Sequence, residues 1–221
     1  MDVEQTTQVF NRIADAWYNV RHYTIFRDEL EELAQQWGTG KLLNAGCGHG
    51  ADFLPFVENG DFELHGVDIA EEMIENAETF AEKHGFDAAL HAADMRNLPY
   101  SIETFDYFIC IAALHHLPQH ADRITALKEL FYTLKRGGKG CITVFNRRHP
   151  KFWFHGKETE LPWENKGEGH VHRYYYLYTR SALKNDLEEA GFTVNKITGE
   201  KDFNGPDYFA RNIIAHVRRP A

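Results

Sequence analysis

The stretch that decides the fold is Lys41-Leu42-Leu43-Asn44-Ala45-Gly46-Cys47-Gly48-His49-Gly50. It begins as a short apolar run, which predicts a buried strand, and it ends in three glycines. Glycine has no side chain, so the backbone can turn sharply there and bring its N–H groups against a ligand. In open α/β sheets ligands bind beyond the carboxyl ends of the strands, and the turn at 44–50 is therefore the first candidate binding site.

On both sides of this turn the apolar residues follow alternating strand and helix patterns. Helical spacing predicts helices over 3–20 and 24–37, before the turn. The strands expected are 41–45, 62–68, 88–94, 105–112, 140–145, 192–198 and 209–217, and the later helices are 52–59, 71–83, 121–134 and 181–190. This alternation is typical of parallel strands joined by right-handed crossovers, so we predict a doubly wound α/β sheet.

Length and composition are those of one globular domain, which we expect to span 1–221. The chain has 221 residues, of which 43% are hydrophobic and 26% charged, enough for a sizeable core without disulfide or metal staples. Its formal net charge of −9 works against nonspecific binding of a polyanion by the whole surface. A local basic groove, or a partner that supplies one, stays open.

The three cysteines, Cys47, Cys110 and Cys141, are too few and too scattered for a zinc knuckle or a disulfide framework, and no metal site is predicted. We expect them to be reduced and buried, which fits a cytoplasmic protein. The N-terminus lacks the basic and apolar regions of a signal peptide, and no apolar run is long enough to span a bilayer. No association with a membrane is therefore expected.

Acidic residues stand at the ends of the next two strands. Asp68 lies about twenty residues beyond the glycines, where an acid accepts hydrogen bonds from a ribose diol. Asp94 ends the third strand, where its carboxylate can accept from an adenine amino group while Met95 packs on the ring. The turn does not choose a cofactor by itself, because with Ala51 it also satisfies the dinucleotide pattern G-x-G-x-x-A, and a nicotinamide enzyme stays possible at this point.

Two histidines, His115 and His116, follow the fourth strand. The tip of that strand faces the reactive end of a cofactor bound across the first strands. Histidines there can bind an anionic acceptor or move a proton. We therefore expect at least one of them to act on the acceptor.

Residues 146–172 show little periodicity, which predicts a long irregular loop of a kind that is more often functional than idle. The loop begins with Arg147-Arg148-His149 and Lys151, followed by the aromatic run 152–154. Such interleaving suits RNA phosphates and stacked bases, and it equally suits a solvated loop with an aromatic anchor in the core. The tyrosines at 174–178 are expected to alternate in burial along an extended segment, and for them we favour packing over base stacking.

The motifs, taken in this order, resemble those of class I methyltransferases, which use S-adenosylmethionine. The resemblance is carried by 44–50, Asp68, Asp94, Phe105-Asp106 and Leu134-Lys135-Arg136-Gly137-Gly138, and the last of these looks unlike the dehydrogenases. It implies a Rossmann-like, seven-stranded, mostly parallel sheet with an antiparallel last strand. The cofactor contacts that it implies come from Asn44, Gly46, Cys47, Gly48, Asp68, Ile69, Asp94, Met95 and Ile111. Asn44 departs from the pattern, because the family usually has an acid there, but an amide can still orient the glycine loop by hydrogen bonds.

A narrower resemblance is to the tRNA wobble-uridine methyltransferases, which make the methyl ester of 5-carboxymethyluridine. It is carried by 11–21, 111–117, 161–163, 173–178 and 211–214. It implies that tRNA is the substrate and that a small zinc-binding activator protein covers an apolar edge of the sheet, here the weak strand at 88–93.

The same resemblance assigns roles at the acceptor end of the site. Arg21 and either His115 or His116 are then expected to contact the acceptor. Helices within 1–37 are expected to lie over the active site, and an insertion at 146–180 is expected to shape the acceptor site.

A carboxylate acceptor is already ionised at neutral pH and needs no general base. The enzyme then acts by orientation and by exclusion of water, and Arg21 with a histidine positions an anion. Two other interpretations stay open. One is a small-molecule methyltransferase of the same fold; the other is a noncatalytic cofactor-binding subunit, against which the intact glycines and acids count.

Overall fold

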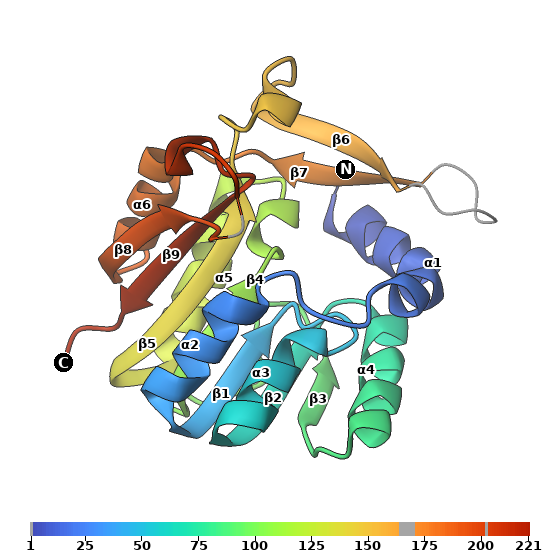
Figure 1. Ribbon diagram of the computed structural model, residues 1–221, viewed down its shortest axis with the longest axis vertical. Coiled ribbons are helices and arrows are strands. Elements are labelled where there is room, and N and C mark those ends of the chain that lie inside the picture. The colour runs from blue at the N-terminus through green and yellow to red at the C-terminus, as the bar shows by residue number, and fades with distance from the viewer. Residues whose placement is uncertain (1, 164–170, 202) are drawn as a thin grey trace.

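The central feature of the computed structural model is a seven-stranded sheet (Figure 1). The structure describes residues 2–163, 171–201 and 203–221. The strand order is β3-β2-β1-β4-β5-β9-β8, and the neighbours from β3 to β5 pair in parallel. β9 lies between β5 and β8 and is antiparallel to both, which confirms the predicted antiparallel last strand. The strands are β1 Thr39–Ala45, β2 Asp61–Asp68, β3 Ala89–Ala92, β4 Phe105–Ile111, β5 Leu134–Phe145, β8 Thr193–Gly199 and β9 Asn212–Arg218.

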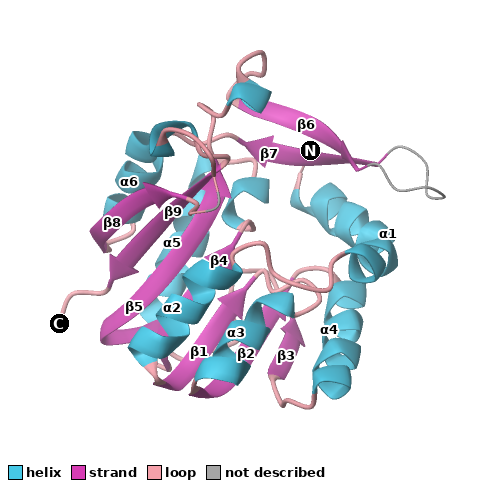
Figure 2. Ribbon diagram, in the orientation of Figure 1, coloured by secondary structure: helices cyan, strands magenta, loops and turns pink. Residues whose placement is uncertain are grey.

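Helices cover both faces of this sheet, as Figure 2 shows. On one face lie α2, α3 and α4; on the other lie α5 and α6. The helices are α2 Arg27–Trp37, α3 Leu54–Asn59, α4 Glu71–His84, α5 His120–Thr133 and α6 Arg180–Glu189. Strands covered on both faces are expected to be continuously apolar, as β4 is from Tyr107 to Ile111. The predicted doubly wound α/β sheet is confirmed.

The turn after β1 is sharp because its glycines adopt conformations that other residues avoid. Gly46 has φ +75° and Gly48 has φ +52°, in the left-handed region. The N–H groups of Gly46 and Cys47 donate to the carbonyl of Val67 over 2.8 and 2.9 Å. These two bonds fix the turn against the end of β2, directly beside Asp68.

A second, two-stranded sheet and helix α1 (Val3–Val20) lie beyond the carboxyl ends of the central strands (Figure 1). The two strands, β6 (Glu158–Trp163) and β7 (Val171–Tyr176), pair antiparallel. Helix α1 buries Ile13 and Ala14 against a cluster that includes residues of α4 and β7. These elements close the end of the sheet at which the glycine turn lies.

The strands β6 and β7 contradict the irregular loop predicted for 146–172. Half-buried Thr159, Leu161 and Trp163 alternate with exposed neighbours along β6, which is a strand pattern. Pro162 argued against a strand at the level of sequence, because proline is depleted in strands. It is tolerated in a strand that pairs on one side alone.

The tyrosines at 174–178 are all buried, so the expected alternation of burial is wrong, whereas the expected packing is confirmed. Tyr175 packs on Phe145, with ring centroids 4.9 Å apart. Tyr176 lies under the Arg123 guanidinium, and Tyr178 donates a hydrogen bond to Asp186 over 3.0 Å. Burial does not alternate because both faces of this segment are covered.

Two smaller expectations can be compared with the structure. Cys47, Cys110 and Cys141 are free and buried, as predicted. Within the described ranges, none of the helices combines the length and apolarity that crossing a bilayer requires.

Candidate active site

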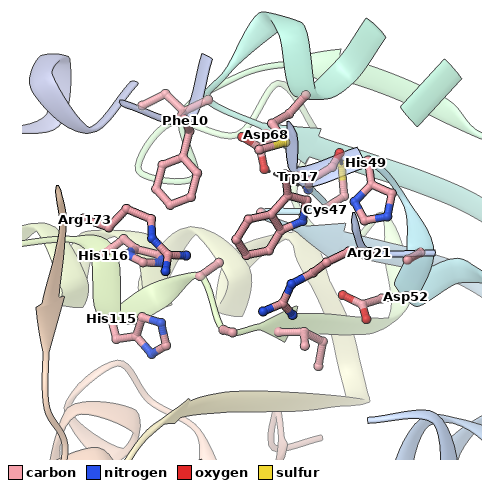
Figure 3. Close-up of a pocket in the computed structure, with 18 of the residues that line it drawn as sticks. Phe10, Trp17, Arg21, Cys47, His49, Asp52, Asp68, His115, His116 and Arg173 are labelled. Atoms are coloured by element: carbon pink, nitrogen blue, oxygen red, sulfur yellow. Dashed lines mark hydrogen bonds between the residues drawn. The ribbon is translucent and has the colours of Figure 1, made fainter. Parts of the chain in front are cut away.

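The candidate site is a pocket between the carboxyl ends of the central strands and the cover formed by α1 and β7 (Figure 3). It brings together nearly all the residues predicted from the sequence. Those that line it are Arg21, Gly46, Cys47, Gly48, Asp68, Ile69, Asp94, Met95, Ile111, His115 and His116. Of the N-terminal segment at 1–37, α1 and the residues at 21–26 reach the pocket, whereas α2 covers the sheet.

The backbone of the glycine turn and Asp68 build one end of the pocket. Gly48 N–H donates to Asp68 Oδ2 over 2.9 Å, and Ala70 N–H donates to Oδ1 over 3.0 Å. Burial raises the pKa of the Asp68 carboxyl, and these N–H groups oppose the rise. The carboxylate is thereby held at the pocket wall with lone pairs left for further donors.

The space around the glycines fits a bound cofactor. A Cβ on Gly46 would lie 2.3 Å from Cβ of Ala113 and 3.4 Å from Cε of Met95, so no side chain fits there. A Cβ on Gly48 would meet nothing within 4 Å, because that side of the turn opens into free space. The turn therefore presents bare backbone to a cavity, which is the arrangement that a nucleoside-bearing cofactor requires.

Asp94 lines the same end of the pocket but already has a strong partner. Arg96 binds it through Nε and Nη2, at 2.9 and 2.6 Å from Oδ2. Arg96 Nη1 also donates to Asp122 over 2.9 Å, which ties the end of β3 to α5. The Asp94 carboxylate is thus fixed in place, and Met95 beside it approaches Gly46.

Asn44 is the one predicted cofactor residue that does not line the pocket. Its side chain is fully buried, and neither amide atom has a hydrogen-bond partner in the described part of the chain. The expected hydrogen bonds from this amide to the glycine loop are therefore not observed. A buried amide without partners is costly, so this position remains the most unusual of the site.

Three arginines converge on the other end of the pocket. Arg21 follows the last turn of α1, Arg173 lies on β7, and Arg211 precedes β9. Across the three described segments, none of these guanidinium groups forms an ion pair with a carboxylate within 4.0 Å. Arg21 is stacked over the ring of Trp17 at 4.3 Å, Arg173 lies 4.9 Å from that of Trp163, and Arg211 lies 5.0 Å from that of Phe145.

The electrostatics of this end follow from burial and from the proximity of like charges. Burial lowers the pKa of Arg173, and the Arg21 and Arg211 charges lower it further. Nε of Arg173 and Nε of Arg211 are buried without a partner among the described residues. Guanidinium donors that form no ion pair within 4.0 Å among the described residues make a site for an anion, since arginine keeps its charge even when partly buried.

Sequence reasoning did not select Arg173 and Arg211 as site residues. They appeared only within the ranges 173–178 and 211–214 that carry the resemblance to the wobble-uridine family. A usable signal was the placement of Arg173 at the start of an aromatic run, because aromatic faces support a guanidinium without neutralising it. Arg211 carried no such signal, since only the turn before β9 brings it to the pocket. The insertion predicted at 146–180 supplies Arg173 and Tyr175 to this end, and 164–170 lie outside the described residues.

The two histidines are held in different tautomers by their backbone partners. His115 Nδ1 accepts from Phe145 N–H over 3.0 Å, so its proton lies on Nε2, which is buried and has no partner among the described residues. His116 Nδ1 lies 2.8 Å from the carbonyl of Tyr174 and donates to it, which leaves Nε2 with a lone pair. One ring thus offers a donor and the other an acceptor.

Both histidines are neutral at physiological pH. Burial lowers the pKa of His116 to about 3, and the Arg173 charge contributes to this. Burial also lowers the pKa of His115 well below its usual range, with His116 and Arg173 acting in the same direction. A ring with so low a pKa is a poor base at neutral pH, so these side chains are suited to hydrogen bonding rather than to proton abstraction.

Asp52 is a carboxylate that acts on Arg21 (Figure 3). Its negative charge opposes the lowering of the Arg21 pKa that burial causes. Burial raises the pKa of Asp52 to about 6, and a hydrogen bond from Thr24 and the Arg21 charge both oppose the rise. Its charge therefore changes close to neutral pH, unlike that of the histidines.

The fold is that of the class I methyltransferases, and the glycine turn with the acids of β2 and β3 forms the end of the pocket at which we expect S-adenosylmethionine to bind. Residues 42–138 match the protein family described as "Methyltransferase domain". The chain is an enzyme of this class, and S-adenosylmethionine is its cofactor. The nicotinamide interpretation, which the glycine turn alone left open, is set aside.

The comparisons extend this match to proteins with different acceptors. A 27-O-demethylrifamycin SV methyltransferase of Amycolatopsis mediterranei is 31% identical over 55% of this chain and 44% of its own length. A probable tRNA methyltransferase 9B of Homo sapiens is 28% identical over 72% of this chain and 32% of its own length, so the chain spans less than half of either relative. The solved 1,6-didemethyltoxoflavin-N1-methyltransferase of Burkholderia thailandensis, with S-adenosylhomocysteine bound, has 20% identity and a TM-score of 0.72, covering 99% of this chain and 88% of its own.

Proposed function

We propose that this chain methylates a carboxylate, and specifically the carboxymethyl group of a tRNA wobble uridine. The observation that carries the proposal is the convergence of Arg21, Arg173 and Arg211 at the acceptor end of the pocket. An amine gains no ion pair from three half-buried guanidinium groups, whereas a carboxylate gains charge-assisted hydrogen bonds from them.

S-adenosylmethionine, when bound, would supply a methyl group on a sulfonium, whose C–S bond would break as a C–O bond to the carboxylate forms. No proton is released, so no base is needed. The chain's own contribution is to hold the acceptor in line. Arg21 and Arg173 bind the carboxylate, and His115 Nε2–H is a further donor at the same end of the pocket.

The tRNA part of the proposal rests on sequence rather than on the arginines alone. The blocks at 11–21, 111–117, 161–163, 173–178 and 211–214 resemble the wobble-uridine family over nearly the whole chain. The similarity to a probable tRNA methyltransferase of Homo sapiens supports the same assignment.

The alternative function is methylation of a small molecule. It is supported by the similarity to the rifamycin methyltransferase and by the net charge of −9, which disfavours a polyanion over most of the surface. A small carboxylic acid satisfies the arginines as well as a modified uridine does.

A partner protein belongs to the tRNA proposal. β3 lies at the edge of the sheet, has four residues, and exposes Ala89, His91 and Ala92. An unprotected edge is open to pairing with another chain, and we assign it to a small zinc-binding activator protein. Activity assays of the chain therefore need arms with and without such a subunit.

The test is methyl transfer from labelled S-adenosylmethionine to bulk tRNA that has been treated with mild alkali, which hydrolyses wobble methyl esters to carboxylates. Label is expected in treated tRNA, in little of the untreated tRNA, and it is expected to leave as volatile methanol on a second alkali treatment. Alkali-stable label, or label that enters small phenols and acids but not tRNA, contradicts the proposal and favours the alternative.

A further inference from the structure

A surface of basic and aromatic side chains lies outside the pocket, at the segment after β5 and the segment before β9. It consists of Arg147, Arg148, Lys151, Trp153, Phe154 and Tyr208, and is called here the Trp153 face. Trp153, Phe154 and Tyr208 are 60%, 99% and 42% exposed, so this face presents three aromatic rings to solvent. Phe152, which directly precedes Trp153, is fully buried and anchors the segment.

The two segments of the Trp153 face are held together by specific contacts. Trp153 Nε1–H donates to the carbonyl of Arg148 over 2.8 Å, and the Arg148 guanidinium lies 4.7 Å from the ring of Tyr208. The buried amide of Asn146 donates to the carbonyls of Tyr208 and Ala210, over 3.0 and 2.8 Å. The exposed rings are therefore presented by a fixed backbone.

The Trp153 face is continuous with the acceptor end of the pocket. Phe145 and Arg211 line the pocket and lie 5.0 Å apart, ring to guanidinium. Asn146 N–H donates to the carbonyl of Arg211 over 2.9 Å. The segment after β5 and the segment before β9 therefore leave the pocket side by side. Figure 1 places both segments above the ends of β5 and β9. A polymer whose reactive group enters the pocket can therefore reach the exposed rings.

The charge of this face opposes that of the whole chain. Arg147, Arg148 and Lys151 are exposed, and none of the three pairs with a carboxylate in the parts of the chain that the structure describes. Asp207, next to Tyr208, is bound by Arg180 at 2.6 Å. In a chain of net charge −9, three neighbouring cations that pair with no described carboxylate favour a polyanion at this place.

We infer that the Trp153 face binds single-stranded RNA, namely the loop nucleotides that flank the one whose base enters the pocket. Bases stack on Trp153 and Phe154, and phosphates bind Arg147, Arg148 and Lys151. Stacking on exposed aromatics beside basic residues is the usual means of holding unpaired nucleotides. The inference rests on the proposed function and specifies where the RNA outside the pocket is bound.

The first measurement is equilibrium binding of a fluorescent anticodon stem-loop that contains 5-carboxymethyluridine. Trp153→Ala and Phe154→Ala are each expected to weaken binding about ten-fold, and Trp153→Tyr is expected to retain most of the affinity, because a ring face remains. Tyr132→Ala is the matched control: Tyr132 is 50% exposed and lies on α5, away from the pocket.

The second measurement is the salt dependence of the same binding. Arg147→Ala and Arg148→Ala are each expected to reduce the slope of log affinity against log salt by about 0.7. Lys128→Ala removes one exposed charge from α5 and is expected to leave the slope unchanged. Binding of S-adenosylhomocysteine, followed by calorimetry, is expected to be the same in all variants and controls.

The outcomes separate this inference from the proposed function. If the wild type esterifies alkali-treated tRNA and the variants of the face show the same affinity and KM, the inference is overturned and the proposed function stands. If the wild type binds S-adenosylhomocysteine but neither binds nor methylates the RNA, both are overturned. If the variants lose binding of anionic vesicles or of an acidic peptide but not of RNA, the face serves a membrane or a protein and the inference is wrong.

Discussion

The two ends of the pocket are built in opposite ways. The cofactor end comes from one part of the chain, between Gly46 and Ala113, and it presents backbone N–H groups and carboxylates. The acceptor end is assembled from Arg21, Arg173 and Arg211, which lie far apart in sequence, and it presents guanidinium groups. One end is mainly backbone and acidic, whereas the other is mainly side chain and basic.

This difference indicates which substitutions should affect cofactor binding and which should affect acceptor binding. Backbone geometry at the cofactor end depends on φ angles and close contacts, so a single added carbon is enough to disturb it. Side chains at the acceptor end can be changed one at a time, because aromatic faces rather than hydrogen-bond networks support them. Substitutions are therefore expected to separate cofactor binding from acceptor binding.

The largest effect is expected from Gly46→Ala. The new Cβ lies 2.3 Å from Cβ of Ala113, and the residue has φ +75°, so the turn must shift. Affinity for S-adenosylhomocysteine, measured by calorimetry, is expected to fall about 100-fold. Gly85→Ala is the matched control, since Gly85 has φ +69° at the end of α4 but no atom within 4 Å of the new Cβ. Equal losses in both variants would show that backbone strain alone is responsible.

Arg173→Gln is expected to reduce kcat/KM for the carboxylate acceptor about 100-fold, because a charge-assisted pair with a half-buried guanidinium is lost. Affinity for S-adenosylhomocysteine is expected to stay within about two-fold of the wild type, which also reports that the variant is folded. Arg173→Lys keeps the charge but not the planar fork and is expected to recover part of the loss. A parallel fall in cofactor affinity contradicts the separation of the two ends.

Asp68→Asn is expected to weaken S-adenosylhomocysteine binding about ten-fold and to leave the acceptor KM unchanged. The amide replaces a carboxylate that accepts from Gly48 N–H and Ala70 N–H, and its NH₂ group cannot accept from either. Calorimetry and initial rates on the same preparation give both numbers. A raised acceptor KM with normal cofactor affinity is the opposite of this expectation.

The smallest effect is expected from the titration of Asp52. Its pKa is raised to about 6, so above that pH it carries a charge that competes with the acceptor for Arg21. Acceptor affinity is expected to fall about two- to three-fold as the pH rises through 6, and Asp52→Asn is expected to remove this dependence. A limb of the pH–rate profile that disappears instead in His116→Gln, with the rate otherwise retained, argues for a base and against a carboxylate acceptor.

The same shift affects folding. Because the folded-state pKa of Asp52 lies above its ordinary value of 3.8, its stabilising contribution is fully present below about pH 4 and is lost as the pH rises through 6. The stability of the wild type relative to Asp52→Asn is therefore expected to decline over that window in urea titrations.

Much of the cofactor end could be predicted because its signals are local. A strand followed by glycines, and an acid at the end of the next strand, are patterns in neighbouring residues, and they placed Gly46, Gly48 and Asp68 correctly in the pocket. The role expected for the Asn44 amide is not observed, because hydrogen bonds of a buried amide depend on the neighbours that tertiary packing supplies.

The acceptor end was less predictable because its signals are long-range. Arg21 and the two histidines were expected there, but Arg173 and Arg211 were not selected, since their meeting depends on where β7 and the turn before β9 lie. The strand β6 was missed because Pro162 outweighed an alternation of only three half-buried residues. Pairing partners, not propensity, decide such a strand.

The strand β7 carries Arg173 and Tyr175, and its Tyr174 carbonyl accepts a hydrogen bond from His116. This strand pairs with β6 in a sheet that is separate from the central one. Part of the acceptor end is therefore carried by a unit that does not pair with the central sheet. A chimera in which β6 and β7 are grafted from a methyltransferase of different specificity is expected to change the acceptor while keeping the cofactor. Substitutions in β6 and β7 can then alter acceptor specificity while the cofactor end of the pocket stays the same.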